Sequence, residues 1–203
     1  MASEPQAIAL AAAAIKRGKL VVFPTDTLYG VGTNAFDENA VLCLFAVKRR
    51  PLNKGIPILL SDLADLEKVA ASIPGIARDL MERFWPGPLT LIVPRHPALP
   101  KAVSDNDGIA VRIPDCELAR AVIRAAGGAV ATSSANLSGH APAQTAEHAL
   151  MELAEHISVV LDGGPSGQAV ASTIIDCIGE TPRILRPGPI TAVELNLFGK
   201  SNE

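Results

Sequence analysis

The sequence predicts a mixed α/β domain, on three observations. Apolar residues make up 48% of the 203 residues, which is typical of a chain with a packed core. Candidate helices and short apolar runs typical of strands intermix along the whole chain. Two of these runs, 89–93 and 109–113, follow one another with no helix between them, so a simple doubly wound sheet fits poorly. We therefore expect one α/β domain over residues 1–203, built on a mixed sheet.

Capping residues and apolar runs locate the elements of the first half. Ser3 can cap a first helix that Gly18 ends. Asp37 can cap a second helix, which runs to a basic cluster at 48–54. The other elements expected here are strands at 19–23 and 56–60, a loop at 24–32, a helix opened by Ser61 and Asp62, and a helix at 74–84.

The second half shows the same kinds of signal. Asp115 can cap a helix that ends at the glycine pair 127–128, and Thr145 can cap a helix that runs to about His156. The expected strands are 89–93, 109–113, 129–132, 159–161, 172–176 and 184–185. We find no internal repeat, so these elements belong to one continuous domain.

Composition argues against several classes of protein. The net charge of −3 is not that of a strongly basic nucleic-acid-binding protein. The three cysteines are far apart and the four histidines show no metal-ligand spacing, so we expect no structural zinc site. The N-terminal segment lacks a basic stretch followed by a long apolar run. We infer a cytoplasmic protein without a membrane span.

Polar residues follow the expected strand 19–23 directly, in the segment 24–32. Thr25 and Thr27 supply hydroxyls, Asp26 supplies a carboxylate, and the glycines expose backbone amides. Such a set can surround a small polar ligand. The alternative is a turn whose Thr and Asp side chains bind their own backbone. The residues alone leave both interpretations open.

Lys48 and Arg50 belong to the basic cluster at the end of an expected helix. Cations at that place stabilise the helix dipole, and a solvated surface turn would also explain them. Residues two apart do not share a helix face, however. If the chain leaves the helix here, both side chains can turn toward one polyanion. Arg supplies a bidentate fork and Lys a point charge, a combination suited to phosphate.

Further donors lie in two later segments. Ser134 and Asn136 stand in the hydroxyl-rich run 132–139, where they can hold phosphate oxygens or cap a helix. No G-x-S-x-G surrounds Ser134, so we do not expect it to be a nucleophile. Nearer the C-terminus, the glycines at 163–164 permit close backbone approach and Arg186 adds a cation.

Two common nucleotide-binding motifs are missing from the sequence. It has no G-x-x-x-x-G-K-[ST] and no G-x-G-x-x-G that opens a helix after a strand. The residues by themselves therefore predict an anion-binding cavity in an α/β domain. They leave the reaction open.

Eight short motifs narrow the choice, because they occur in the order found in the YrdC family. They are Pro24-Thr25-Asp26-Thr27-Leu28-Tyr29-Gly30, Lys48-Arg49-Arg50-Pro51, Trp85-Pro86-Gly87-Pro88-Leu89-Thr90, Val111-Arg112-Ile113-Pro114, Ser134-Ala135-Asn136, Asp162-Gly163-Gly164, Ser172-Thr173-Ile174 and Arg186-Pro187-Gly188. They span about residues 18–191 and leave a short C-terminal tail. Over that span the chain resembles the YrdC family.

The resemblance implies a YrdC-like twisted mixed sheet with flanking helices around a large, positively lined cavity. It also implies an enzyme, the nucleotidyltransferase L-threonylcarbamoyladenylate synthase. In that reaction, the amine of L-threonine takes up bicarbonate or carbon dioxide as a carbamate, which attacks the α-phosphate of ATP and releases pyrophosphate. The product, threonylcarbamoyl-AMP, would feed the modification of adenosine 37 in tRNAs that read codons beginning with A. A downstream tRNA threonylcarbamoyl transferase complex would complete that step.

The resemblance also implies roles for individual residues. Lys48, Arg50 and Tyr29 are the expected catalytic residues, the first two as a phosphate clamp and Tyr29 at the carbamate. The expected ATP-binding residues are Lys48, Arg50, Ser134, Asn136, Ser172 and Arg186. The expected threonine-binding residues are Thr25 and Arg112, with Arg112 on the carboxylate. Mg²⁺ is expected with ATP, held through the phosphates and not by a protein cage.

The chain departs from some relatives in two ways. Some carry a histidine in the strand after the K-x-R motif, where this chain has Leu59 and Leu60. Longer relatives carry a second domain, and we expect this chain to be of the single-domain type. The main alternative is a non-catalytic RNA-binding module with weak tRNA or RNA binding, which the net charge and the scarce aromatics disfavour. A carbamoyl transferase part for hydrogenase maturation would be a much longer protein.

Overall fold

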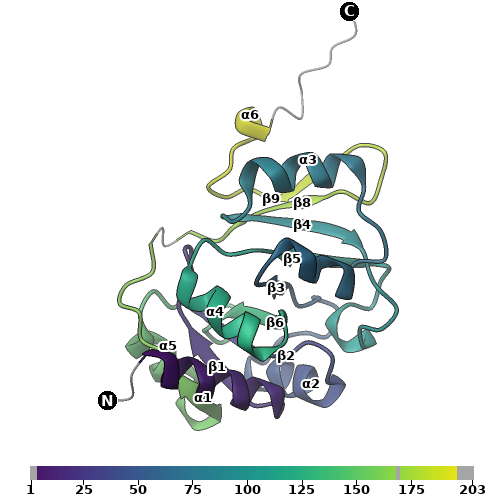
Figure 1. The fold of residues 1–203 in the computed structure, drawn as a ribbon. Helices are drawn as coiled ribbons and strands as arrows, with labels where there is room; N and C mark the ends of the chain where they lie inside the picture. The colour runs from purple at the N-terminus through teal and green to yellow at the C-terminus, as the bar shows by residue number, and fades with distance from the viewer. Residues whose placement is uncertain (1–3, 168–169, 196–203) are drawn as a thin grey trace, which may run out of the picture.

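The computed structural model describes residues 4–167 and 170–195, in which helices flank a single sheet (Figure 1). The elements, in chain order, are α1 (Glu4–Lys16), β1 (Leu20–Phe23), β2 (Gly30–Asn34), α2 (Glu38–Val47), β3 (Ile58–Leu60), η1 (Leu63–Lys68), α3 (Gly75–Phe84), β4 (Leu89–Pro94), η2 (Lys101–Val103), β5 (Gly108–Arg112), α4 (Glu117–Ala126), β6 (Ala129–Ser134), α5 (Ala146–Leu153), η3 (Ala154–His156), β7 (Ile157–Val160), β8 (Thr173–Asp176), β9 (Arg183–Arg186) and α6 (Ala192–Leu195). Ser3, the expected cap of the first helix, lies outside the described residues. None of the helices in these two ranges has the length and hydropathy that crossing a membrane requires.

The sheet is mixed, as predicted. Its described strands run in the order β7-β1-β2-β6-β3-β5-β4-β8-β9. The pairs β1–β7, β3–β5 and β4–β8 are parallel, and the other neighbours are antiparallel. Strands β4 and β5 follow one another without an α-helix and pair directly, which confirms the sequence argument against a doubly wound sheet.

Strand β2 corrects one expectation, because the segment 24–32 was expected to be loop throughout. The chain joins the sheet at Gly30, between β1 and β6. A Cβ atom on Gly30 would lie 2.8 Å from Thr132 Cγ2, and one on Gly32 would lie 2.7 Å from Val130 Cγ1. Side chains of β6 fill the space above these glycines, so the glycine run suits a buried strand and not only a turn.

Two of the expected helix caps are confirmed and one is wrong. Asp37 and Thr145 each accept the backbone N–H three residues on, at 3.1 Å. The N-cap of α4 is Cys116 and not Asp115. The carbonyl of Cys116 accepts the first helical N–H, from Arg120, so Asp115 stands one residue outside the helix.

A short helix follows Ser61 and Asp62, as expected, but it is a 3₁₀ helix, η1. The capping box holds its start: Asp62 accepts from the backbone of Asp65, while the Asp65 carboxylate accepts from the backbone N–H of Asp62 at 3.2 Å. The last predicted helix also changes type, since α5 ends at Leu153 and a 3₁₀ turn covers the residues to His156.

Two hydrophobic clusters occupy opposite faces of one half of the sheet. Val21 and Phe23 pack with apolar residues of α1 and α4, which lie side by side in Figure 1. Leu20 and Val22 point the other way, into the larger cluster that α2, α3 and α5 help to form. This alternation is the period of an extended strand buried on both faces.

In the other half, one face of the sheet is left to a cavity. Leu89, Leu91 and Val93 of β4 pack in the core with residues of α3, which covers that face (Figure 1). Their neighbours Thr90 and Ile92 line the cavity instead. Because successive side chains of a strand point to opposite faces, the hydrophobic core and the cavity lie on opposite sides of the same strand.

Candidate functional site

The site is a cavity of about 960 Å³, at the upper end of the range for small-molecule sites. Eight of the nine predicted site residues line it: Thr25, Tyr29, Arg50, Arg112, Ser134, Asn136, Ser172 and Arg186. The ninth, Lys48, is not among the lining residues in the described part of the chain. Segments that lie far apart in the sequence thus converge on one space.

Strand register brings two of the motifs together. Strands β2 and β6 pair antiparallel, with Gly30 opposite Ser134. The loop that enters β2 therefore lies beside the loop that leaves β6. A backbone hydrogen bond from Ala135 N to Tyr29 O, 2.8 Å long, continues the contact beyond the strands. The two polar segments form one wall of the cavity.

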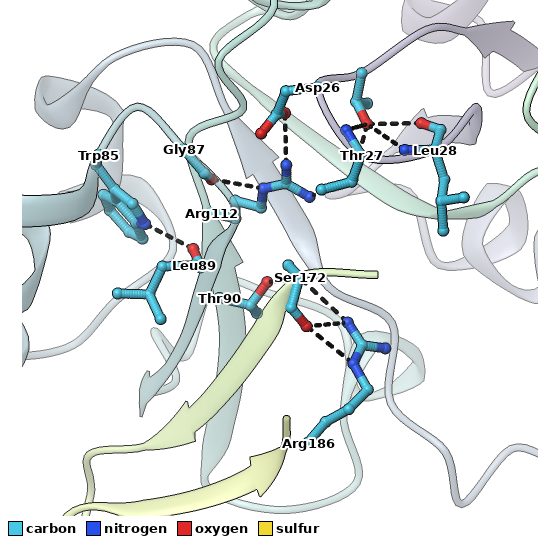
Figure 2. Close-up of polar contacts among 11 residues, drawn as sticks. Asp26, Thr27, Leu28, Trp85, Gly87, Leu89, Thr90, Arg112, Ser172 and Arg186 are labelled. Atoms are coloured by element: carbon cyan, nitrogen blue, oxygen red, sulfur yellow. Dashed lines mark hydrogen bonds and ion pairs between the residues drawn. The ribbon is translucent and has the colours of Figure 1, made fainter. Parts of the chain in front are cut away.

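Arg112, at the end of β5, is held by three groups. Its Nε donates to Gly87 O at 2.9 Å, its Nη1 donates to Thr27 Oγ1 at 2.9 Å, and its Nη2 pairs with Asp26 Oδ1 at 2.5 Å. Figure 2 shows the guanidinium lying between Gly87 and the Asp26–Leu28 loop. Burial lowers the pKa of Arg112, and the charge of Asp26 opposes that shift. Arg112 is a fixed, oriented cation in the cavity wall.

The Thr25 hydroxyl organises its own turn. It donates to Leu28 O at 2.6 Å and accepts from the backbone N–H groups of Thr27 and Leu28 at 3.2 Å (Figure 2 shows Thr27 and Leu28). This is the self-bonded turn that the sequence left open as an alternative. Thr25 also lines the cavity, so its place is compatible with both the self-bonded turn and a ligand-binding segment.

The Tyr29 hydroxyl joins the residue before β2 to the loop after β7. It lies 2.6 Å from Gly164 O and 3.2 Å from Asp162 Oδ1, and it accepts from Gly163 N at 3.1 Å. Burial is the main cause that raises the pKa of Tyr29, and the Asp162 carboxylate adds to it. The phenol stays protonated at neutral pH, as a positioned neutral group beside the glycine-rich loop.

Ser172 and Arg186 form a second polar group on the far wall. Arg186 donates from Nε and Nη2 to Ser172 O, at 3.0 and 2.8 Å, and from Nη2 to Ser172 Oγ at 3.1 Å (Figure 2). Ser172 Oγ also lies 2.7 Å from Thr90 Oγ1. Burial lowers the pKa of Arg186, and the charges of Arg112 and Arg50 lower it further. The three arginines therefore face one shared space.

Arg50 lines the cavity just after α2. Its Nε donates to Lys54 O at 2.9 Å and its Nη2 donates to Gly55 O at 2.7 Å. Burial lowers its pKa. The intervening Arg49 has φ +50°, so the chain does leave the helix at this point. That turn sends the side chains of Lys48 and Arg50 to different places.

Lys48 itself is only 1% exposed. Its Nζ donates to Ser134 O at 2.5 Å and also to Asn136 O. The sequence led us to expect that Lys48 and Arg50 both turn toward one polyanion. Arg50 lines the cavity, and Lys48 does not. Direct contact between Lys48 and a phosphate stays a prediction.

Asn136 is set into a turn that ends at His140. Its Nδ2 donates to Leu137 O and to His140 O, both at 2.8 Å, while its buried Oδ1 has no partner in the described residues. The His140 ring lines the cavity, and its Nδ1 lies 2.9 Å from a Glu152 oxygen. Asn136 lines the cavity, but its Oδ1 is buried within the wall.

Sequence reasoning missed several residues of the site. Asp26 and Thr27 stood inside a predicted motif, yet nothing in the sequence showed that they hold Arg112. Thr90 also stood in a motif, and the strand period could have placed it on the same face as Ile92. His140 and Arg183 carry no sequence signal, because only the tertiary fold brings them to the cavity.

Positive charge outweighs negative charge on the cavity wall. Among the described lining residues the charged side chains, histidine aside, are Arg50, Arg112, Arg183, Arg186, Asp107 and Asp176. One of the two carboxylates, Asp176, is paired with Arg183 at 3.0 Å. The cavity suits an anionic ligand that is larger than a single phosphate.

Comparison with known proteins finds relatives that match most of the chain. The model of the Sua5/YciO/YrdC family, described as "Telomere recombination", matches residues 13–188. A Mycobacterium tuberculosis protein is 44% identical over 185 residues, which cover 91% of this chain and 85% of that protein. The threonylcarbamoyl-AMP synthase of Bacillus subtilis is 42% identical over 195 residues, which cover 95% of this chain and 56% of that enzyme. The chain thus spans little more than half of the longer relative.

Solved structures show the same fold. The crystal structure of Pyrococcus abyssi Sua5 complexed with L-threonine superposes with a TM-score of 0.93 and 39% identity, over 98% of this chain and 59% of that one. Both the family model and the relatives cover nearly all of the segment in which the eight motifs lie. This chain belongs to the Sua5/YciO/YrdC family.

Proposed function

We propose that this protein is a threonylcarbamoyl-AMP synthase, which uses L-threonine, bicarbonate and ATP. The observation that carries the proposal is the convergence of Arg50, Arg112 and Arg186 on one cavity with Ser134 and Asn136. Relatives of this chain are named for that activity, and the Pyrococcus structure holds L-threonine. A cavity of about 960 Å³ has room for an amino acid and a nucleotide together.

The reaction couples two bond-forming steps. The neutral threonine amine first adds to bicarbonate and gives a carbamate, with loss of water. A carbamate oxygen then attacks the α-phosphorus of ATP, and the bond to pyrophosphate breaks. Phosphoryl and nucleotidyl transfers of this kind depend on positioning and on stabilising charge at the phosphate oxygens.

The phosphate groups belong on the side of Arg50 and Arg186. Both guanidiniums line the cavity, and Arg provides planar, charge-assisted donors for phosphate oxygens. Ser134 and Asn136 add neutral polar groups on the adjoining wall. Ser172 is already bound to Arg186, so it orients that guanidinium and offers its hydroxyl beside it.

Threonine belongs on the side of Arg112. Three of its five N–H donors are engaged by Gly87, Thr27 and Asp26 in the described part of the chain. The remaining two can take the threonine carboxylate. Thr25 lines the same end of the cavity, and Tyr29, which also lines the cavity, is the residue that we assign to the carbamate.

Mg²⁺ accompanies ATP in this proposal. In the described ranges, no group of three His, Cys, Asp or Glu side chains is arranged to hold a metal ion. ATP phosphates and water would coordinate the ion, which is how proteins usually bind Mg²⁺ with nucleotides. When bound, the ion would neutralise charge on the leaving pyrophosphate.

The product would serve a downstream tRNA threonylcarbamoyl transferase complex in the cytoplasm. Such a complex would transfer the threonylcarbamoyl group to adenosine in tRNA. A role as a non-catalytic RNA-binding module is disfavoured, because the net charge is −3 and the cavity is sized for a small molecule.

Product analysis with labelled bicarbonate tests this function. The purified protein is incubated with ATP, Mg²⁺, L-threonine and ¹³C-bicarbonate, and the products are identified by mass spectrometry. We expect threonylcarbamoyl-AMP with one ¹³C atom in its carbamoyl group. AMP-threonine without the label would indicate attack by the amino-acid carboxylate and would overturn the proposal.

A further inference from the structure

Lys48 is a buried cation in an unusual place. Its side chain is among the largest fully buried ones, yet it lies behind the cavity wall and not on it. Taking an ammonium out of water is costly unless its donors are satisfied. Here two backbone carbonyls accept hydrogen bonds from it, those of Ser134 and Asn136. Both belong to the segment that presents polar side chains to the ligand.

The backbone strengthens the same connection. The carbonyl of Lys48 accepts a hydrogen bond from Ser138 N, 2.9 Å long. Within the segment, Asn136 N donates to Ser134 O at 2.9 Å, so this oxygen receives both the amide and the ammonium. The end of α2 is thus tied to residues 134–138 through its side chain and through its main chain.

Burial also affects the charge of this group. Together with the charge of Arg50, it lowers the pKa of Lys48 to about 8, and the charge of Glu152 opposes the shift. The ammonium form still prevails at neutral pH. A charged donor makes stronger hydrogen bonds to carbonyls than a neutral one, so the charge reinforces the tie to the segment.

We propose that Lys48 is a positioning residue, which holds the backbone of Ser134–Asn136 from behind so that their side chains face the ligand. For the nature of that ligand, a nucleotide, the inference rests on the proposed function. Arg50, two residues on, faces the cavity directly. The two cations of this motif thus act on opposite sides of the wall, one on the protein and one on the ligand.

Hydrogen exchange of the ligand-free protein tests the positioning role. Lys48→Met keeps the length of the side chain and removes its donors, and Lys54→Met is the matched control from the same basic cluster. We expect the backbone amides of residues 136 and 138 to exchange at least about tenfold faster in Lys48→Met, and at the wild-type rate in Lys54→Met. Unchanged exchange at 136–138 in a folded Lys48→Met variant would overturn the proposal.

Steady-state kinetics distinguishes positioning from a general loss of stability. Ser134 and Asn136 lie on the nucleotide side, so Lys48→Met should raise KM for ATP about tenfold and leave KM for threonine within about twofold. An equal rise in both constants would contradict positioning of this segment. The exchange measurement needs no substrate, so it can succeed even if the proposed reaction is wrong.

The wild-type protein supplies a test that needs no variant. With ¹⁵N-labelled lysine, the Lys48 ammonium should give a slowly exchanging NMR signal without ligand. That signal should persist when ATP and Mg²⁺ saturate the site. Loss of its protection on ATP binding, with a new coupling to ³¹P, would show that the ammonium leaves the carbonyls for the phosphate and would overturn the proposal.

Discussion

Asp26 and Arg112 form a buried ion pair that joins the loop before β2 to the end of β5. The Oδ1–Nη2 distance is 2.5 Å, and the two side chains are 12% and 6% exposed. The other carboxylate oxygen, Asp26 Oδ2, is buried and has no hydrogen-bond partner in the described residues. The pair holds in place the guanidinium that we assign to threonine; Figure 2 shows the contact between the two side chains.

Asp26→Asn tests what this pair contributes. The amide keeps the shape and removes the charge, so one charge-assisted hydrogen bond is weakened in a buried place. We expect the free energy of unfolding, measured in urea, to fall by about 1.5–3 kcal/mol. We also expect KM for threonine to rise. The exposed control Asp115→Asn should stay within about 0.5 kcal/mol of wild type. An Asp26→Asn variant with unchanged stability and KM would show that the pair is dispensable.

Arg50→Ala tests the phosphate side of the cavity. Its guanidinium lines the cavity, and removing one preorganised donor to a developing charge typically costs about a hundredfold in rate. We expect that loss in kcat/KM for ATP, with little change in stability. The neighbouring exposed Arg49→Ala is the control. Near-normal turnover of Arg50→Ala would remove Arg50 from the phosphate site.

Amino-acid choice tests the threonine end. A site that hydrogen-bonds the threonine hydroxyl leaves its own polar group unpaired with valine, so valine should be rejected strongly. Serine keeps the hydroxyl and lacks one methyl group, which should cost about 1–3 kcal/mol. Steady-state rates with the three amino acids give the order threonine, serine, valine. Faster turnover of valine than of serine would contradict a hydroxyl-reading pocket near Thr25.

The pKa of Lys48 predicts a pH dependence. Because its pKa is lowered to about 8, the side chain is an ammonium below pH 8 and a neutral amine above it. Arg50 and Glu152 are the charged groups that act on it. If the charged form holds Ser134–Asn136, KM for ATP should rise by up to about tenfold between pH 7 and pH 9.5. That rise should be absent in Lys48→Met, and its presence there would assign it to another group.

Local signals predicted much of the fold. Asp37 and Thr145 cap their helices as expected, since an N-cap depends on a few neighbouring residues. The glycines of β2 did not predict a strand. They are required there because the side chains of Thr132 and Val130 on β6 leave no room for a Cβ atom. That restriction is created by tertiary packing, which no local window contains.

The site, too, was predicted from the sequence only in part. Motifs identified eight residues that do line one cavity, although they lie on β5, β6, β9 and the loops between strands and helices. They could not show where each side chain points. Lys48 and Arg50 share a motif, yet the turn at Arg49, with φ +50°, sends Lys48 into the protein and Arg50 to the cavity. Nor did any motif show that Thr27 and Asp26 hold Arg112.

The central claim is that a carbamate of threonine attacks the α-phosphate of ATP in this cavity. A coupled pyrophosphate assay, with one component omitted at a time, tests it most directly. We expect pyrophosphate only when ATP, Mg²⁺, threonine and bicarbonate are all present, and we expect no need for RNA. Release that continues in degassed buffer without bicarbonate would indicate attack by the threonine carboxylate. Folded protein that releases no threonine-dependent pyrophosphate with every component supplied would contradict the claim.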